Sequence, residues 1–138
     1  MFFEGGSWHN RMQVAFSAYI ASSRSLPTNK KLIIDKTRTN IGNAYSTSNG
    51  IFTAPVDGMY AFHWTMTVLK GYHSIIRLQV NGSNKADMYA FARNYPNHYS
   101  PSQSYVTELK KGDQVNLYNS GSSGYVYGSY STFTGYRL

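Results

Sequence analysis

Apolar and polar residues alternate with a period of two along most of this chain, which is the pattern of β-strands that bury one face. The longest example follows Met59, where one side of the expected strand carries large residues and the other carries small or polar ones. The large residues are Tyr60, Phe62, Trp64, Met66 and Val68, and the residues between them are Ala61, His63, Thr65 and Thr67. No stretch sustains a helical period, so the sequence predicts an all-β chain.

The expected strands are short and are separated by turn signals, as in a β-sandwich or barrel of about ten strands. Residues 14–20, which place Phe16 and Ile20 on one face, and residues 31–35 are expected to form two of the early strands. Asn81-Gly82 predicts a two-residue hairpin turn. Residues 94–103 contain two prolines and predict an exposed loop. No linker divides the 138 residues, so a single domain is expected.

The chain carries a formal net charge of +7, with 13 Lys and Arg residues against 6 Asp and Glu residues. This balance favours acidic partners such as sialylated or sulfated glycans, lipopolysaccharide or nucleic acid. The chain has no cysteine, and no apolar run approaches the roughly 18 residues of a membrane helix, so we expect neither a disulfide nor membrane insertion. The densest basic group is either a solvated edge or an anion-binding patch: Lys30, Lys31, Lys36 and Arg38.

The residue types that enzymes bring together are sparse in this sequence. The four histidines show no metal-ligand spacing, no two carboxylates form a close sequence pair, and the GxSxG, GxGxxG and P-loop motifs are absent. The 13 tyrosines are spread through all the expected strands, so we interpret them as sandwich residues and not as a stacking platform for nucleic acid. We therefore expect no catalytic residue, no metal site and no nucleic-acid partner.

An aromatic residue follows Asn40, and a phenylalanine and a Gly-x-Tyr-x-Phe motif come after it at fixed distances. The residues of this pattern are Asn40, Tyr45, Phe52, Gly58, Tyr60 and Phe62. Their spacing resembles the signature of the globular domain of the complement C1q family, within the C1q and tumour-necrosis-factor superfamily. Ile34 and Trp64 depart from the residues usual at the two ends of the pattern, but both remain apolar.

Five further segments resemble their family counterparts in the same order along the chain. They include LKKGDQV at 109–115, which contains Gly112, and STFTGYRL at 131–138, which contains Phe133 and Gly135. The resemblance covers residues 14–138. Residues 1–13 match nothing in the family, so we expect an added or unstructured leader followed by one domain.

The resemblance implies a ten-stranded jelly roll of two five-stranded sheets, assembled as a homotrimer. It also implies a secreted, non-enzymatic recognition module. Ala61 and His63, on the second face of the strand that follows Met59, are positions that a trimer seam could use. A solvated outer face is the alternative for these two residues.

The loop at residues 91–103 (FARNYPNHYSPSQ) corresponds to the one through which several relatives bind calcium at the trimer apex, as the resemblance implies. It contains no acid, and Arg93 would repel a cation, so we expect the calcium site to be lost and no cofactor to be bound. The same loop supplies the candidate ligand-binding residues, because a fixed cation, flat rings and switchable donors suit an anionic glycan such as a sialic acid. Packing of the loop against itself is the alternative. The candidates are Arg93, Tyr95, His98 and Tyr99.

Asn81-Gly82-Ser83 is also an N-glycosylation sequon, but a turn explains the Asn-Gly pair without a sugar. The leading hypothesis is a secreted, trimeric C1q-type lectin of innate immunity, similar to the stalkless forms of invertebrates. Such a lectin would act in pattern recognition and bind microbial or host glycans without calcium. The alternative is an extracellular signalling or scaffold ligand with a protein receptor or a matrix partner.

Overall fold

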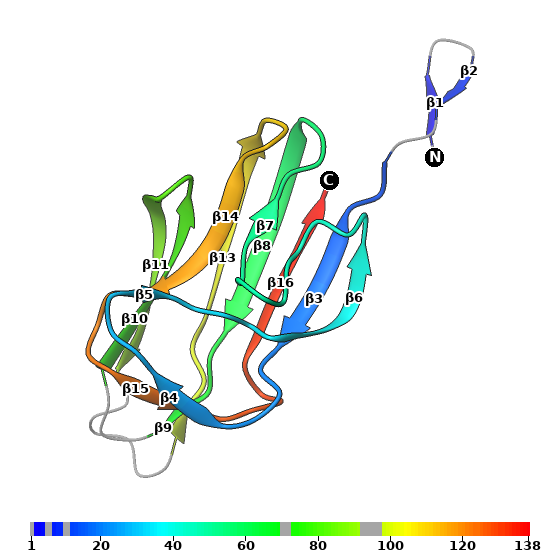
Figure 1. The fold of residues 1–138 in the computed structure, drawn as a ribbon. Coiled ribbons are helices and arrows are strands. Elements are labelled where there is room, and N and C mark those ends of the chain that lie inside the picture. The colour runs from blue at the N-terminus through cyan, green and yellow to red at the C-terminus, as the bar shows by residue number, and fades with distance from the viewer. Residues whose placement is uncertain (1, 5–6, 10–11, 70–72, 92–97) are drawn as a thin grey trace.

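The computed structural model describes residues 2–4, 7–9, 12–69, 73–91 and 98–138, with side chains from residue 12 onward. The described residues form strands, turns and bends, and they include no helix that could cross a membrane. Two sheets make the layers of a sandwich, and a smaller sheet lies at one end of it (Figure 1). A separate hairpin pairs β1 (Phe2–Glu4) with β2 (Ser7–His9).

The first sheet has the antiparallel order β13-β8-β16-β3-β6. Its strands are β13 (Ser102–Leu109), β8 (Gly58–Thr65), β16 (Thr132–Arg137), β3 (Ala15–Tyr19) and β6 (Lys36–Ile41). The second sheet has the order β11-β10-β14-β5, and β7 also pairs with β14. Its strands are β11 (Ser83–Phe91), β10 (His73–Val80), β14 (Gln114–Asn119), β5 (Lys30–Lys31) and β7 (Phe52–Thr53). The end sheet has the order β12-β9-β15-β4, with β12 (His98–Tyr99), β9 (Val68–Leu69), β15 (Gly124–Val126) and β4 (Arg24–Leu26).

This architecture confirms the predicted all-β jelly-roll sandwich, but the strand expected at residues 31–35 is wrong. Strand β5 ends at Lys31, and residues 32–35 link it to β6 without a strand of their own. Leu32 and Ile34 are buried in the core, and the Leu32 amide donates to the Leu117 carbonyl at 2.9 Å. The apolar alternation there reports burial of a crossing segment, which pattern alone does not distinguish from a paired strand.

Only the second part of the loop expected at residues 94–103 falls on described residues, and that part is mostly strand. Residues 92–97 lie outside the described residues, whereas His98–Tyr99 form β12 and Ser102 begins β13. Pro101 stands just before β13, where its missing N–H interrupts no ladder, and its carbonyl accepts a hydrogen bond from the Met66 amide at 3.3 Å. Pro101 therefore marks the edge of a strand, whereas Pro96 lies outside the described residues.

Aromatic rings from both sheets fill the space between the layers, as the alternation from Tyr60 predicted. The Phe16 ring lies at the centre of this group, stacked on Tyr45 with centroids 4.6 Å apart and set edge-on to Phe133 at 5.0 Å. It also faces Phe52 of the second sheet at 5.4 Å. Among the signature residues the following are buried: Tyr45, Phe52, Tyr60, Phe62, Trp64 and Phe133.

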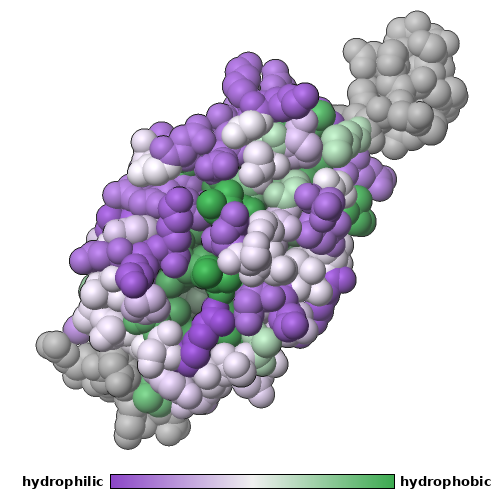
Figure 2. All heavy atoms as spheres, in the orientation of Figure 1, coloured by the Kyte–Doolittle hydropathy of each residue, from purple (hydrophilic) through white to green (hydrophobic). Residues whose placement is uncertain are grey.

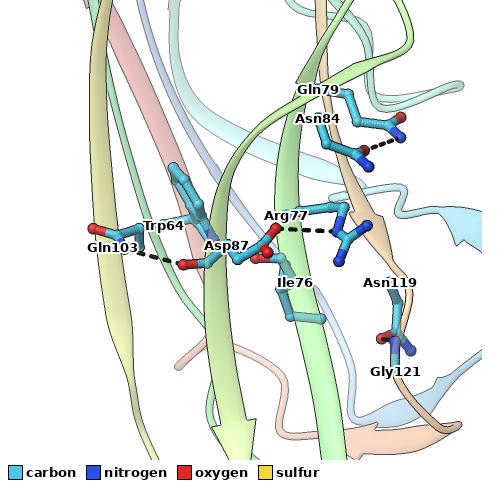
Figure 3. Close-up of polar contacts among 9 residues, drawn as sticks. All are labelled: Trp64, Ile76, Arg77, Gln79, Asn84, Asp87, Gln103, Asn119 and Gly121. Atoms are coloured by element: carbon cyan, nitrogen blue, oxygen red, sulfur yellow. Dashed lines mark hydrogen bonds and ion pairs between the residues drawn. The ribbon is translucent and has the colours of Figure 1, made fainter.

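Two side-chain hydrogen bonds join the sheets where β8 and β13 face β10 and β11. The Trp64 Nε1–H donates to the Ile76 carbonyl at 3.3 Å, and the Gln103 Nε2–H donates to the Asp87 carbonyl at 3.1 Å. On β10 and β11 an ion pair between Arg77 Nε and Asp87 Oδ1, 3.1 Å long, lies close by (Figure 3). These contacts fix one edge of the sandwich while the rings fill its middle.

Two glycines of the family signature lie where a side chain has no room. A Cβ on Gly135 would approach Phe16 Cε1 to 2.6 Å and Phe62 Cδ1 to 2.7 Å. A Cβ on Gly58 would meet Arg137 Nε at 2.6 Å, and this side chain donates through Nη2 to the Asp57 carbonyl at 3.0 Å. The rings beside Gly135 are held by the core, so that position tolerates a methyl group least.

We expect Gly135→Ala to lower the free energy of unfolding by about 1–3 kcal/mol, because overpacking forces the surrounding rings to move. Denaturant unfolding of the purified protein measures the change. Phe16→Leu replaces the ring that the new methyl group meets with a smaller side chain. In the Gly135→Ala background it is therefore expected to lower the free energy of unfolding by less than it does in the wild-type protein. Additive losses in the double variant would contradict this account of Gly135.

The predicted two-residue turn at Asn81-Gly82 is confirmed, and both residues have positive φ, at 50° and 81°. The Asn81 side chain joins this turn to the one between β13 and β14, which contains Gly112. Its Nδ2–H donates to Asp113 Oδ1 at 3.0 Å, and its Oδ1 accepts from the Gln114 amide at 2.9 Å. The side-chain amide of Asn81 is thus used in hydrogen bonds that join two turns. This supports the interpretation of Asn81-Gly82 as a turn and not as a glycosylation site.

The hydrogen bonds of these two turns also lower the pKa of Asp113. The Lys110 amide donates to Asp113 Oδ2 at 2.8 Å, and this bond, followed by the one from Asn81, holds the pKa of the carboxyl below its ordinary value. Both hydrogen bonds favour the ionised form, so the stabilisation exists above the unfolded pKa of about 3.9 and is lost as the pH falls through the lower folded pKa.

We expect Asp113→Ala to lower the melting temperature at neutral pH, and the difference from wild type to shrink as the pH falls below about 4, where the carboxyl of the unfolded chain takes up a proton first and that of the folded protein follows at lower pH. Thermal unfolding over a series of pH values measures this. Glu108→Gln, at an exposed acid of β13, is the control and is expected to give no such trend. A pH-independent difference for Asp113→Ala would show that the carboxylate charge plays no part.

Candidate ligand-binding site

The structure places part of the predicted recognition loop at one end of the sandwich. Arg93 and Tyr95 lie outside the described residues. His98 and Tyr99 form β12, where His98 pairs with Leu69 and Tyr99 with Val68. The end sheet that contains them lies away from the end where the chain terminates at Leu138 (Figure 1). His98 and Tyr99 are therefore held on a strand, whereas the sequence predicted them in a loop.

A hollow of about 410 Å³ opens beside His98, and we call it the tyrosine pocket. It lies where the chain after β12 meets the segment between β15 and β16 and the short link between β8 and β9. These segments are far apart in the sequence and meet because β15 pairs with β9 through Val126 and Val68. The residues that line the pocket are Thr67, His98, Ser100, Tyr127 and Tyr130.

Hydroxyl and backbone hydrogen bonds hold the floor of the pocket. Thr67 Oγ1 lies 2.8 Å from Ser100 Oγ and 3.3 Å from the Tyr130 carbonyl. The Thr67 amide donates to Ser131 Oγ at 3.0 Å, and that hydroxyl donates to the Tyr127 carbonyl at 3.1 Å. Thr67, which was predicted on the solvent side of a long strand, is buried because β8 ends at Thr65 and the chain turns into β9.

Aromatic faces form the walls of the pocket. Tyr130 is 69% exposed, the largest exposure among the exposed large hydrophobic residues. The His98 ring lies edge-on to Tyr127 with centroids 5.4 Å apart, and Tyr127 in turn lies edge-on to Tyr125 at 6.0 Å. Flat apolar faces beside hydroxyl and imidazole groups can bind a ligand that has both apolar and polar edges.

The sequence analysis missed Tyr127 and Tyr130 as pocket residues. Strand β15 begins at Gly124 and ends at Val126, so Tyr127 and Tyr130 lie in the segment YGSYS that follows it. The signal that could have been used is the density of tyrosines, because three fall within six residues. Their juxtaposition with His98 depends on the pairing of β9 with β12 and β15, which no local pattern reports.

Among the described residues, no acidic side chain lines the tyrosine pocket. Within the part of the chain that the structure describes, no group of three His, Asp or Glu residues is placed to hold a metal ion. The donor set of the pocket consists of hydroxyls, one imidazole and aromatic rings. Calcium requires several carboxylate or carbonyl oxygens, so these residues do not fit it.

The basic residues singled out in the sequence do not share one sheet. Lys30 and Lys31 lie on β5 of the second sheet, whereas Lys36 and Arg38 lie on β6 of the first. All four are exposed, and the Arg38 guanidinium lies 3.8 Å from the centroid of the Tyr19 ring. Figure 2 shows hydrophilic residues spread over one whole face of the molecule, with hydrophobic surface in separate patches. This placement favours the solvated edge over a single anion-binding patch.

The outer face of the first sheet carries an apolar row across all five strands. Cα pairing places Val106 opposite Ala61, Ala61 opposite Tyr136, Tyr136 opposite Ala15, and Ala15 opposite Ile41. Val106, Tyr136 and Ile41 are 53%, 46% and 48% exposed. Exposed apolar residues gathered in one row are typical of an interaction surface.

The neighbouring row on the same face is polar. It aligns hydroxyl side chains around the exposed His63: Ser104, Thr134, Ser17 and Thr39. Ala61 and His63, the two residues considered for a trimer seam, therefore belong to an apolar row and a hydroxyl row side by side.

Curated relatives match nearly all of this chain. Human complement C1q tumor necrosis factor-related protein 3 is 32% identical over 131 residues, which are 92% of this chain and 52% of that protein. Heavy metal-binding protein HIP of the mussel Mytilus edulis is 32% identical over 130 residues, which are 91% of this chain and 60% of that protein. The chain thus spans only about half of the length of the curated relatives it matches.

Solved structures and a family model agree on the fold. The globular domain of zebrafish complement 1qA superposes with a TM-score of 0.73 at 16% identity, covering 91% of this chain and 97% of that one. The Eiger tumour necrosis factor of S. frugiperda superposes with a TM-score of 0.74 at 10% identity, covering 93% and 94%. The model of the C1q domain matches residues 15–138. Because that match extends over almost the whole chain, this protein belongs to the C1q domain family.

Proposed function

We propose that this chain is a secreted, trimeric, non-enzymatic recognition module that binds anionic glycans such as sialic acids without calcium. The observation that carries the proposal is the tyrosine pocket, whose exposed Tyr130 ring and hydroxyl floor lie beside His98. Sugar rings present apolar C–H faces and many hydroxyls, so they match aromatic walls and a floor that both donates and accepts hydrogen bonds.

The described lining of this pocket has no charged partner apart from the titratable His98, so an anionic sugar would depend on a cation from beyond that lining. The chain carries a net charge of +7, and none of the described residues that line the pocket is acidic. Arg93, in the adjoining segment outside the described residues, remains the candidate cation for a sialic acid carboxylate. Since calcium would need oxygen ligands that the pocket and residues 91–103 do not supply, recognition is proposed to be independent of metal.

Association into a trimer is proposed through the outer face of the first sheet. Its apolar row exposes three large side chains in each copy, and burial of such residues favours association by about 25 cal/mol per Å² of apolar surface. Three copies of a weak glycan site on one particle would then act together on a surface that carries many glycans. A trimer would therefore bind such a surface more tightly than one pocket could alone.

A protein ligand is the second candidate partner, and a separate surface favours it. Tyr89 and Phe91 are exposed on β11, with ring centroids 5.1 Å apart, and the His73 ring lies edge-on to Phe91 at 4.5 Å. Exposed aromatic groups are enriched at the centres of protein interfaces. A nanomolar protein partner that free sugar does not displace would support this signalling or scaffold role.

The glycan proposal predicts saturable binding of N-acetylneuraminic acid glycans on an array and in titration calorimetry, unchanged by a chelator and weakened by added salt. Tyr130→Ala is expected to weaken binding about fivefold, since one aromatic contact contributes on the order of 1 kcal/mol, whereas Tyr130→Phe keeps the ring and most of the affinity. Arg93→Ala is expected to remove the preference for charged sugars.

Tyr89→Ala, which removes an exposed tyrosine of the second sheet, is the matched control and is expected to leave binding unchanged. Equal affinity of wild type and Tyr130→Ala would exclude the tyrosine pocket. Binding that disappears with chelator would exclude the proposed independence from calcium.

The trimer proposal predicts a mass near three times 15.5 kDa by light scattering at micromolar concentration. Val106→Lys is expected to yield the monomer, because it puts an unpaired charge into the proposed apolar contact while its side chain stays in water in the separate chain. Tyr89→Lys places the same charge at an exposed position of the other sheet and should keep the trimer. A wild-type monomer of 15.5 kDa would refute the seam.

A further inference from the structure

We infer that this chain has a second binding site, a groove beside β6 and β7 that accepts uncharged sugars. The groove has a volume of about 640 Å³ and is lined by residues of the segment 37–55 together with Gln114. Ligand pockets in proteins commonly measure about 300–1,000 Å³, so its size suits a short oligosaccharide. It shares no lining residue with the tyrosine pocket.

No charged side chain is found among the described residues that line the groove, although the chain as a whole carries a net charge of +7. Its lining consists of hydroxyl, amide, glycine and apolar residues. An anionic ligand bound here would lose water without gaining a charged partner, which is costly. The lining therefore selects against the ligands that the rest of the surface attracts and favours uncharged ones.

Several lining side chains are available to a ligand. Thr37, Asn43, Thr47 and Gln114 make no side-chain hydrogen bond with any described residue. Asn43, Thr47 and Gln114 are exposed, and Thr53, which also lines the groove, is exposed as well. Hydroxyl and amide groups both donate and accept, as sugar hydroxyls do, so one cluster can satisfy a ring whose hydroxyls need both kinds of partner.

Apolar contact is available in the same place. Ala44, Ile51 and Pro55 are half-buried members of the lining. Binding sites for small molecules commonly combine apolar surface with a few placed polar groups. The C–H face of a sugar ring can rest on the apolar residues while its hydroxyls reach the amides and threonines.

The fold holds this groove in shape before any ligand arrives. The side chain of Asn40 donates through Nδ2–H to the Tyr45 carbonyl at 2.8 Å and accepts through Oδ1 from the Tyr45 backbone N–H at 3.3 Å. The Tyr45 ring is stacked on Phe16, and its hydroxyl donates to the Ile34 carbonyl at 2.7 Å. The loop then closes through the Thr53 amide, which donates to the Ala44 carbonyl at 2.9 Å. A segment fixed in this way loses little conformational freedom on binding.

Two threonines of β6 provide a matched test. Thr37 lines the groove, whereas Thr39, two residues further along the strand, is exposed and does not line it. Maltotriose and chitotriose, both uncharged, are titrated at millimolar concentration into ¹⁵N-labelled protein, and amide shifts are followed by NMR. We expect shifts in residues 37–55 and in Gln114, with an affinity that added salt leaves unchanged.

Thr37→Ala and Gln114→Ala are each expected to weaken the affinity about three- to tenfold, the effect of one lost hydrogen bond. Asn43→Gly is expected to do the same, and glycine tolerates the positive φ of 52° at that position. Thr39→Ala and Tyr130→Ala should bind like wild type.

Absence of groove shifts with both sugars would overturn the inference. Equal loss in Thr37→Ala and Thr39→Ala would overturn it as well, because the effect would then not depend on the groove. Light scattering of the same variants tests whether a second copy of the chain occupies the groove: a lower mass for Thr37→Ala or Gln114→Ala than for wild type would assign the groove to an interface and also overturn the proposal.

Discussion

The packing of the Phe16 ring on Tyr45, Phe52 and Phe133 is the interaction on which the two-layer arrangement depends. It joins a strand of the first sheet to one of the second, and it leaves so little space that Gly135 can carry no side chain beside it. A core that consists of close-packed rings cannot rearrange locally without a cost of several kcal/mol. The segments attached to these rings, residues 40–53 above all, are therefore held in place by the core although they lie at the surface.

Much of the fold could be predicted from the sequence because burial of one strand face leaves a local signal. The alternation from Tyr60 to Trp64 and the Asn81-Gly82 turn each report a constraint that acts within a few residues. Residues 32–35 gave the same signal for a different reason, since Leu32 and Ile34 are buried in a link that forms no strand of its own, although the Leu32 amide donates to the Leu117 carbonyl of β14. The two-residue alternation alone indicates that a side chain faces the core. It does not indicate that the backbone of that residue forms a β-strand.

The candidate sites were predictable only in part, for a related reason. His98 stood out by its chemistry, but Tyr127 and Tyr130 reach it through the pairing of β9 with β15, and the threonines and amides of the groove look in sequence like ordinary turn residues. Sites made of neutral polar side chains leave no charge run or motif. They become visible only when the fold shows which of these groups already have partners and which face an open hollow.

The two hollows differ in what they can discriminate. In the tyrosine pocket a charge contribution would depend on Arg93, as proposed, and that part of the affinity would fall with salt. The groove has no charged residue in its described lining, so its selectivity would come from the geometry of donors and acceptors that the hydrogen bonds and ring packing of Tyr45 hold in place. In a trimer each kind of site would be repeated threefold, so a surface that presents both charged and uncharged sugars would be held by two independent sets of weak contacts. Discrimination between surfaces would then depend on the combination of sugars and not on the affinity of either site alone.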